Sequence, residues 1–292
     1  MKKATGLSLH IGLNAVDPAQ YEGWSGPLTA CEADAEDMEK IATARGFTAT
    51  ILRTAQATRD SVAGAIKAAA QKLVKGDIFW VSYSGHGGQV PDINGDEPDD
   101  LLDETWCLFD GELLDDELYA LWAQFKPGVR ILMVSDSCHS GSVARLALST
   151  PSTGPARAAL ADFGVNEELR YRFMPREVAL RTYRAHAAFY DSLQPRKARR
   201  GKKGAKPAAT PSVKAPVRLL SGCQDNQLSL DGTFNGLFTS NLLRVWNDGK
   251  FKGNYAAFHK AIVKRMPPTQ TPNHFMTGAH DPDFDAQPPF AI

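Results

Sequence analysis

The sequence predicts an α/β fold with a mostly parallel sheet that is flanked by helices on both faces. Short apolar runs, which are typical of buried strands, alternate with stretches whose apolar residues recur at helical spacing. The connections between them are short, and such connections are typical of parallel strands joined by right-handed crossovers. The chain of 292 residues is long enough for one large core with additions.

Four strands and two helices account for the first half of this pattern. The predicted strands are "GLSLHIGLN" at 6–14, "TATILRT" at 48–54, "DIFWVSYSGHGG" at 77–88 and "GVRILMVSDSCHSG" at 128–141. The predicted helices are 28–47, which Gly46 closes, and 58–76, which Thr58 and Gly76 bound. In a sheet of this kind the chemistry lies at the carboxyl ends of the strands.

Composition excludes several classes of partner. The chain has 33 basic and 33 acidic residues, so its zero net charge gives no general attraction to nucleic acid or to an anionic membrane. No segment approaches the ~20 apolar residues that a membrane span needs. The four cysteines are far apart without CxxC pairing, which favours a reducing compartment. We therefore expect a cytoplasmic protein with no membrane partner, and binding to nucleic acid would require a local basic patch.

Two strand ends carry the residues of a nucleophilic site. His86 lies among the glycines into which the third predicted strand runs, and Cys138 lies at the corresponding end of the fourth, so both should lie at one edge of the sheet. A free thiol with a pKa near ~8.5 is mostly protonated at neutral pH, and a nearby imidazole can activate it. The backbone N–H groups of Gly87 and Cys138 are candidates for stabilising an oxyanion. A buried cysteine and a structural histidine are the alternative, but their equivalent positions favour a catalytic pair.

Several longer motifs resemble those of the metacaspases and their prokaryotic relatives. In chain order they are "YEGWSGPLTACEADAEDM", "YSGHGGQ", "NGDEPDDLLDETW", "LLDDEL", "DSCHSGS", "LLSGCQDNQLS", "NGLFTSNLL" and "QTPNHF". The resemblance covers about residues 5–145 and 217–278. It implies a caspase-hemoglobinase fold and the activity of a cysteine endopeptidase, a hydrolase of the thiol protease type, with a dyad of His86 and Cys138 and no required cofactor.

The resemblance also implies a substrate preference. Metacaspases cut after Arg or Lys, and the positions that match their acidic pocket are Cys31, Asp34, Ser84 and Asp136. The expected partners are therefore proteins or peptides with basic residues. A solvent-exposed helix carboxylate is the alternative for Asp34, and a helix-capping role is the alternative for Asp136.

A calcium site is implied by the same resemblance, at Asp103, Asp115 and Asp116. The family has a fourth aspartate seven residues after the catalytic cysteine, where this chain has Arg145. A guanidinium in place of a carboxylate should weaken or abolish binding of a divalent cation. Asp115 and Asp116 have a structural alternative as the acidic start of a helix.

The middle of the chain does not match the family and sets the expected organisation. Residues 157–194 predict one or two helices, and "PRKARRGKKGAKPAATPSVKAP" has eight Lys or Arg, four prolines and no acidic residue. The latter should be disordered. The resulting division is a large-subunit-like catalytic region at 1–145, a helical insertion at 146–194, a basic linker at 195–216, and a small-subunit-like region at 217–292 that completes the same domain.

The basic linker suggests self-processing. It places exposed basic residues between the two subunit-like parts of an expected protease for basic residues, with candidate cleavage sites after Arg196, Lys197, Arg199, Arg200, Lys202 and Lys203. Two other functions stay open: a catalytically silent caspase-like scaffold, and a protein that binds nucleic acid through this linker.

Overall fold

The computed structural model describes most of the chain. The described residues are 3–93, 102–137, 171–194, 212–223, 229–232 and 234–292. Cys138, Arg145 and all six candidate cleavage sites in the linker therefore lie outside the described residues.

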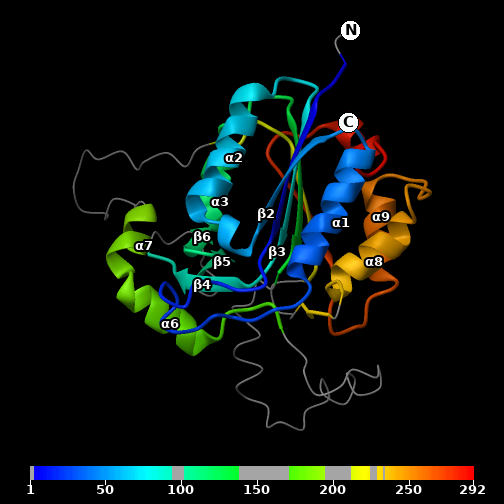
Figure 1. Cartoon of the computed structure of the whole chain (residues 1–292). Coiled ribbons are helices and arrows are strands. Elements are labelled where there is room, and N and C mark those ends of the chain that lie inside the picture. The colour runs from blue at the N-terminus through cyan, green and yellow to red at the C-terminus, as the bar shows by residue number, and fades with distance from the viewer. Residues whose placement is uncertain (1–2, 94–101, 138–170, 195–211, 224–228, 233) are drawn as a thin grey trace, which may run out of the picture.

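A six-stranded sheet forms the centre of the molecule, in the order β2-β1-β3-β7-β8-β9 (Figure 1). All neighbouring strands are parallel except β8 and β9, which are antiparallel. The strands are β1 (Gly6–Gly12), β2 (Thr48–Arg53), β3 (Ile78–Ser84), β7 (Arg130–Asp136), β8 (Val217–Ser221) and β9 (Asn273–Thr277). The mostly parallel sheet predicted from the sequence is confirmed, and the region after residue 217 completes it.

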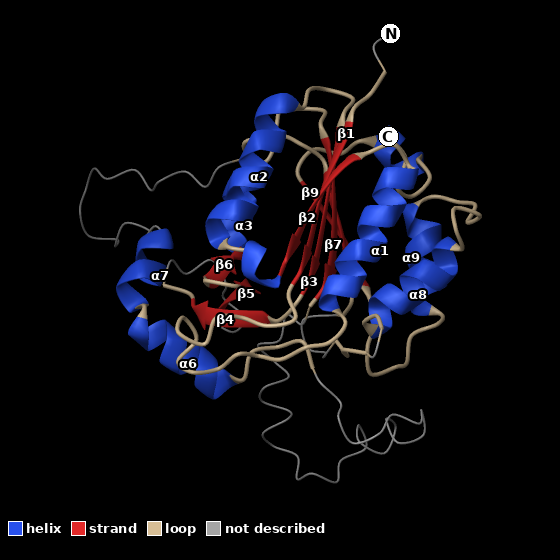
Figure 2. Ribbon diagram, in the orientation of Figure 1, coloured by secondary structure: helices blue, strands red, loops and turns tan. Residues whose placement is uncertain are grey.

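Helices cover both faces of this sheet (Figure 2). One face carries α1 (Cys31–Ala44), α8 (Leu237–Trp246) and α9 (Tyr255–Val263), and the other carries α2 (Arg59–Lys72) and α3 (Asp115–Trp122). The short helix α10 (Pro282–Ala286) packs near α9.

The strands supply two separate cores because successive side chains point to opposite faces. Along β3, Phe79 and Val81 join the core beneath α2 and α3, whereas Ile78 and Trp80 join the core beneath α1, α8 and α9. All four side chains are at most 1% exposed. This double burial explains why the strand appears in the sequence as a continuous apolar run.

A second, antiparallel sheet of three strands follows β3 and was not predicted. It consists of β4 (Gly87–Pro91), β5 (Leu102–Leu108) and β6 (Gly111–Leu114). The helices α6 (Arg176–Ala185) and α7 (Ala187–Leu193) lie beside it (Figure 1). Because β4 begins at Gly87, the predicted third strand is two strands separated by a turn at Gly85 and His86.

Two expectations about the middle of the chain need correction. Tyr171 and Phe173 lie in extended bridges to other segments rather than in a helix. The following Pro175 disfavours a helical conformation for the residue before it, so α6 begins only at Arg176. Residues 212–216, which the predicted linker included, are packed against the core, with Val213 and Ala215 buried.

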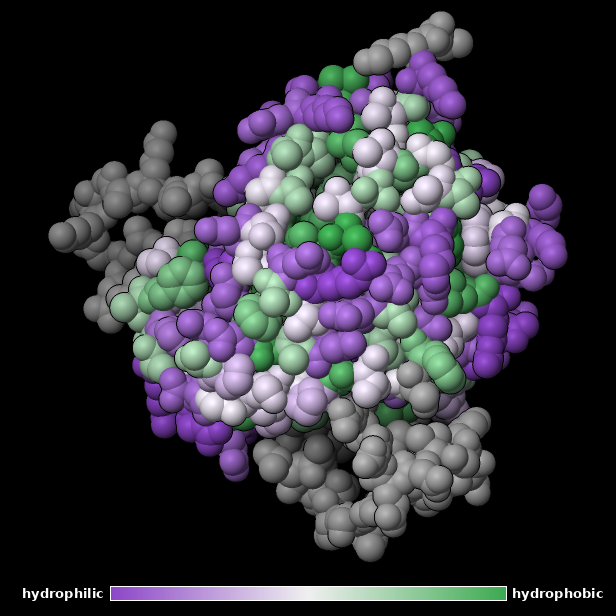
Figure 3. Space-filling view, viewed as in Figure 1, coloured by the Kyte–Doolittle hydropathy of each residue, from purple (hydrophilic) through white to green (hydrophobic). Residues whose placement is uncertain are grey.

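The surface in Figure 3 mixes hydrophilic and hydrophobic residues, and hydrophobic residues gather only in small areas of the face shown. Among the helices that the structure describes, none combines the length and the apolar character that crossing a membrane requires.

Candidate active site

The carboxyl ends of β3 and β7 lie side by side at one edge of the main sheet. Ser84 at the end of β3 is paired with Asp136 at the end of β7. His86 lies two residues beyond Ser84, and Ser137 is the last described residue before Cys138. The chain therefore leaves the described region toward Cys138 at the same edge of the sheet that presents His86.

Asp34 reaches this edge from the first turn of α1. Its carboxylate accepts hydrogen bonds from the Ser84 hydroxyl at 2.7 Å and from the Asn235 amide and the Gly236 backbone N–H, both at 3.0 Å. The residue is 1% exposed, so the alternative of a solvent-exposed helix carboxylate is wrong. Burial raises the pKa of Asp34 to about 6, although the charge of Arg172 opposes the rise.

Asp136 faces Asp34 from the end of β7. One of its oxygens accepts a hydrogen bond from the Ser229 hydroxyl at 2.6 Å, and the other accepts bonds from the Thr239 backbone N–H and hydroxyl at 3.1 and 2.7 Å. Because Thr239 lies in the first turn of α8, Asp136 does cap a helix, but one that is about 100 residues further along the chain. Asp136 therefore caps α8 and also contacts Arg172.

A third carboxylate, Asp231, completes the group and was not predicted. Thr29 holds it through its backbone N–H at 2.8 Å and its hydroxyl at 3.0 Å. Burial would raise the pKa of Asp231, but the neighbouring Arg172 and the hydrogen bonds from Thr29 lower it below its usual value. No local pattern in the sequence links Asp231 to Thr29, since 202 positions separate them.

The three carboxylates surround the guanidinium of Arg172, which is 0% exposed. Its Nη2 lies 2.7 Å from Asp34 Oδ2 and 2.9 Å from Asp231 Oδ1, and its Nη1 lies 3.0 Å from Asp136 Oδ2. Nη1 also donates to the Ser84 hydroxyl at 2.8 Å and to the Asp136 carbonyl at 3.1 Å. Three of the four predicted pocket residues, Asp34, Ser84 and Asp136, therefore contact one buried cation.

Gly236 provides the space that this cation occupies. A Cβ atom at this position would lie 2.6 Å from Cζ and from both terminal nitrogens of Arg172. The guanidinium is therefore surrounded by carboxylates, and the backbone of Gly236 packs directly against it.

Cys31, the fourth predicted pocket residue, is also buried at this edge. Burial raises the pKa of its thiol, and the charge of Arg172 opposes the rise. Cys107 is likewise buried with a raised pKa. Both thiols therefore stay protonated at neutral pH, which disfavours either of them as a nucleophile.

His86 is buried with one ring nitrogen engaged. Its Nε2 lies 2.9 Å from the carbonyl oxygen of Gly26, to which only a protonated nitrogen can donate. Its Nδ1 has no hydrogen-bond partner among the described residues. Burial lowers the pKa of His86 to about 4, a shift that the Gly26 carbonyl opposes. The ring is therefore neutral near pH 7, with the lone pair of Nδ1 free to accept a proton.

Two hollows flank this site. One, of about 340 Å³, is lined by His86 and Trp24 together with Tyr171, Phe173 and Pro175. The other, of about 520 Å³, includes Asp231 and Asn235 in its wall. The first hollow is thus lined by the chain neighbours of Arg172, and the second by Asp231, which contacts its guanidinium.

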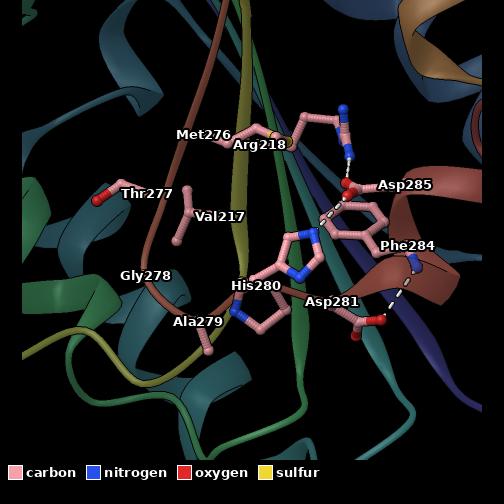
Figure 4. Close-up of a pocket in the computed structure, with 11 residues that line it drawn as sticks. Val217, Arg218, Met276, Thr277, Gly278, Ala279, His280, Asp281, Phe284 and Asp285 are labelled. Atoms are coloured by element: carbon pink, nitrogen blue, oxygen red, sulfur yellow. Dashed lines mark hydrogen bonds and ion pairs between the residues drawn. The ribbon is translucent and has the colours of Figure 1, made fainter.

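A third hollow, of about 230 Å³, lies at the other end of the sheet (Figure 4). Arg218 and Asp285 form an ion pair in its wall, and Asp285 also pairs with His280 at 3.1 Å. It includes none of the predicted site residues.

The predicted calcium ligands lie in the smaller sheet and the helix that follows it. Asp103 is on β5, and Asp115 and Asp116 begin α3. Within the described ranges, no three or more His, Cys, Asp or Glu side chains form a group that could hold a metal. Since residues 94–101 and Arg145 are outside those ranges, the calcium site stays a prediction.

The chain is similar to known proteins over most of its length. The caspase-domain model of the peptidase C14 family matches residues 15–285. Metacaspase-1 from Mycosarcoma maydis is 29% identical over 80% of this chain and 59% of its own length. Metacaspase-1 from Kluyveromyces lactis is 35% identical over 50% of this chain and 36% of its own. The chain thus spans between about a third and three-fifths of these relatives.

Two solved structures share the fold. Protein GSU0716 from Geobacter sulfurreducens is 55% identical, with a TM-score of 0.80 over 99% of both chains. Caspase-1 from Spodoptera frugiperda is 10% identical, with a TM-score of 0.54 over 94% of this chain and 87% of that one, so it shares the fold alone. With a family match over nearly its whole length and metacaspase relatives, this chain belongs to the caspase-domain family of peptidases.

Proposed function

We propose that this protein is a cysteine endopeptidase that cleaves after Arg and Lys. The observation that carries the proposal is the buried guanidinium of Arg172 among Asp34, Asp136 and Asp231. Removing three carboxylates from water is costly unless a cation and hydrogen bonds compensate them. A pocket of this composition, at the edge of the sheet that carries His86, suits a basic side chain of a substrate.

The chemistry follows from the state of His86. Its free Nδ1 takes the proton of the Cys138 thiol, and the thiolate attacks the carbonyl carbon of the peptide bond. The backbone N–H of Gly87 stabilises the negative charge that develops on the carbonyl oxygen, together with the N–H of Cys138. His86 then gives the proton to the departing amine, and water releases the acyl group.

Arg should be preferred over Lys. The pocket engages both terminal nitrogens of the guanidinium, and Nε lies 3.3 Å from Asp231 Oδ1. A planar group with several fixed donors fits such an arrangement better than an ammonium, which is a single compact charge.

A panel of fluorogenic tetrapeptides that vary in the residue before the scissile bond tests the proposal. We expect cleavage after Arg, slower cleavage after Lys, and none after Leu or Asp, in wild type but not in Cys138→Ala or His86→Ala. Running the panel with calcium and with a chelator tests the calcium prediction separately. Cleavage after Leu as fast as after Arg would refute the basic preference.

A further inference from the structure

The backbone around Arg172 is bound as an added strand. The Arg172 N–H donates to the Ser229 carbonyl at 3.0 Å, and Tyr171 forms an antiparallel bridge with Leu230. On the other side, the Met174 N–H donates to the Gly87 carbonyl at 2.7 Å. Extended peptides bind proteins in this way, with backbone bonds for affinity and a side-chain pocket for specificity.

The carbonyl oxygen of Arg172 lies at the backbone N–H group that the sequence suggested for the oxyanion. It accepts a hydrogen bond from the Gly87 N–H at 3.0 Å, and Gly87 is the residue whose N–H was predicted from the sequence to stabilise an oxyanion. The next residue, Phe173, lines the same hollow as His86. The side chain, carbonyl and following residue of Arg172 therefore each lie where the corresponding part of a substrate should lie.

The downstream side of this segment is anchored. Met174, Val178 and Ala179 belong to a buried cluster that also contains Tyr21 and Cys107. The side chain of Arg172 thus lies in the charged pocket, while the chain that follows it is packed in this cluster. The Arg172–Phe173 peptide bond joins these two parts.

We propose that Arg172 is a substrate-like occupant of this protein's own cleft, and that the Arg172–Phe173 bond is its principal self-cleavage site. The proposal rests on the proposed function and adds to it. While the segment is intact it excludes other basic substrates from the pocket. Cutting the bond separates Arg172 from its anchor in α6 and lets it leave.

The reaction at this bond is an ordinary hydrolysis. Cys138 Sγ forms a bond to the carbonyl carbon of Arg172, the bond from that carbon to the Phe173 nitrogen breaks, and the thiol proton passes through His86 to the new Phe173 amine. Water then breaks the thioester, which leaves a carboxylate on Arg172 and restores the thiol. The reaction consumes one molecule of water and changes no oxidation state.

Phe173 offers a variant that separates occupancy from cleavage. No hydrogen bond of its backbone N–H is found among the described residues, so Phe173→Pro removes none of the contacts that hold Arg172. Proline also favours an extended conformation in the residue before it. Its ring at the scissile nitrogen obstructs delivery of the proton that the leaving amine needs, so the pocket should stay filled and the bond intact.

The experiment compares wild type, Cys138→Ala, Arg172→Gln and Phe173→Pro, with Arg199→Gln/Arg200→Gln as the matched control in the basic linker. Each protein is incubated alone, its fragments are measured by intact mass, and its activity on an Arg tetrapeptide is followed over time. Circular dichroism confirms folding of each variant.

We expect wild type and the linker control to yield fragments that end at Arg172 and begin at Phe173, with peptide activity rising as they form. Cys138→Ala should stay whole. Arg172→Gln should stay whole at this bond yet cut the tetrapeptide without a lag. Phe173→Pro should stay whole and be at least tenfold less active than cut wild type.

Two results would overturn the inference and leave the proposed function standing. One is full peptide activity in wild type whose Arg172–Phe173 bond is intact, and the other is cleavage confined to the linker between Arg196 and Lys203. If neither wild type nor Arg172→Gln cuts any Arg peptide, with or without calcium, the proposed function itself fails. Should Arg172→Gln not fold, the fragment masses and Phe173→Pro still decide.

Discussion

Arg172 and Arg218 are both nearly inaccessible to solvent, at 0% and 2% exposure, but their surroundings differ. Arg172 is enclosed by carboxylates from α1, β7 and the segment at Asp231. Arg218, on β8, pairs with the carboxylate of Asp285 (Figure 4). Its Cζ lies 4.9 Å from the ring centres of Tyr255 and Phe284.

The difference indicates which arginine side chain could leave its site without unfolding the core. The strand of Arg218 belongs to the central sheet, so its side chain cannot leave without unfolding part of the core. Arg172 lies in a short extended segment outside the six-stranded sheet, and hollows lie beside its chain neighbour Phe173 and beside Asp231. Burial alone therefore does not distinguish the two arginines, whereas the chemistry of the surrounding groups does: three carboxylates around Arg172, and one carboxylate with two aromatic rings around Arg218.

The largest effect should come from Asp136→Asn in an Arg172→Gln background, where the pocket is empty. Losing one charge of a buried pair typically costs about 2 to 5 kcal/mol, which lowers kcat/KM for Arg peptides about 30-fold or more. Steady-state kinetics on Arg and Leu peptides measure it. If the ratio between the two peptides is unchanged, Asp136 does not select the cation.

Arg218→Ala should lower the stability of the fold and leave peptide cleavage unchanged. It removes packing between two aromatic rings and one ion pair, so we expect a loss of about 2 to 4 kcal/mol in the free energy of unfolding. Activity per folded molecule should be unchanged, because Arg218 is distant from the site. Urea unfolding and peptide kinetics check the two halves, and a variant as stable as wild type would show that Arg218 is not structural.

Gly236→Ala should block the pocket with a single methyl group. Its φ of −59° suits any residue, so the effect is steric and costs about 1 to 3 kcal/mol of guanidinium binding. We expect KM for Arg peptides to rise about tenfold. The matched control is Gly64→Ala on α2, where nothing lies within 4 Å of the added Cβ and kinetics should not change.

The smallest effect should be the pH dependence of Arg binding. Asp34, with a pKa of about 6, faces Arg172, Asp136, Ser84, Asn235 and Gly236. Since only its ionised form attracts a cation, KM for Arg peptides should fall as pH rises through about 6 and above, and Asp34→Asn should flatten this profile.

The pKa shifts of Asp34 and His86 make the stability of the fold depend on pH. The pKa of Asp34 is raised on folding, so its contribution to the free energy of unfolding is present below pH ~4 and is lost as pH rises through about 6. The pKa of His86 is lowered to about 4, so its contribution is present above pH ~6.5 and is lost as pH falls. Thermal unfolding of wild type and Asp34→Asn between pH 4 and 8 should show their difference change only above pH ~4.

The sequence predicted the parts of this structure that depend on continuous patterns. The strands that end at Ser84 and Asp136 are apolar on both faces, and such strands are visible as apolar runs. The strands β4 and β6 are short and begin at glycines, and β5 has three polar residues, Asp103, Glu104 and Thr105, directly after its first residue, so their pattern is weak. Thr58 does cap α2, by accepting a hydrogen bond from the Ser61 N–H.

The acidic pocket was predicted only where a family motif marked it, whereas His86 and Cys138 were also predicted from the strand ends. Asp34, Ser84 and Asp136 lie in such motifs and meet in the structure. Asp231 and Arg172 were missed because what identifies them is contact between segments far apart in the chain, and the alternating pattern around Arg172 resembled a helix.

The place of β8 in the sheet changes the molecularity of folding once the chain is cut. β8 pairs with β7 through Ser135 and Ser221, so a break after Arg172 leaves neighbouring strands of one sheet on different polypeptides. The intact chain refolds in a first-order process. The cut protein must bring two chains together, so its midpoint of unfolding should rise with protein concentration, as for a heterodimer. After denaturation and dilution, the yield of refolded protein should therefore fall with dilution for the cut protein but not for the intact chain.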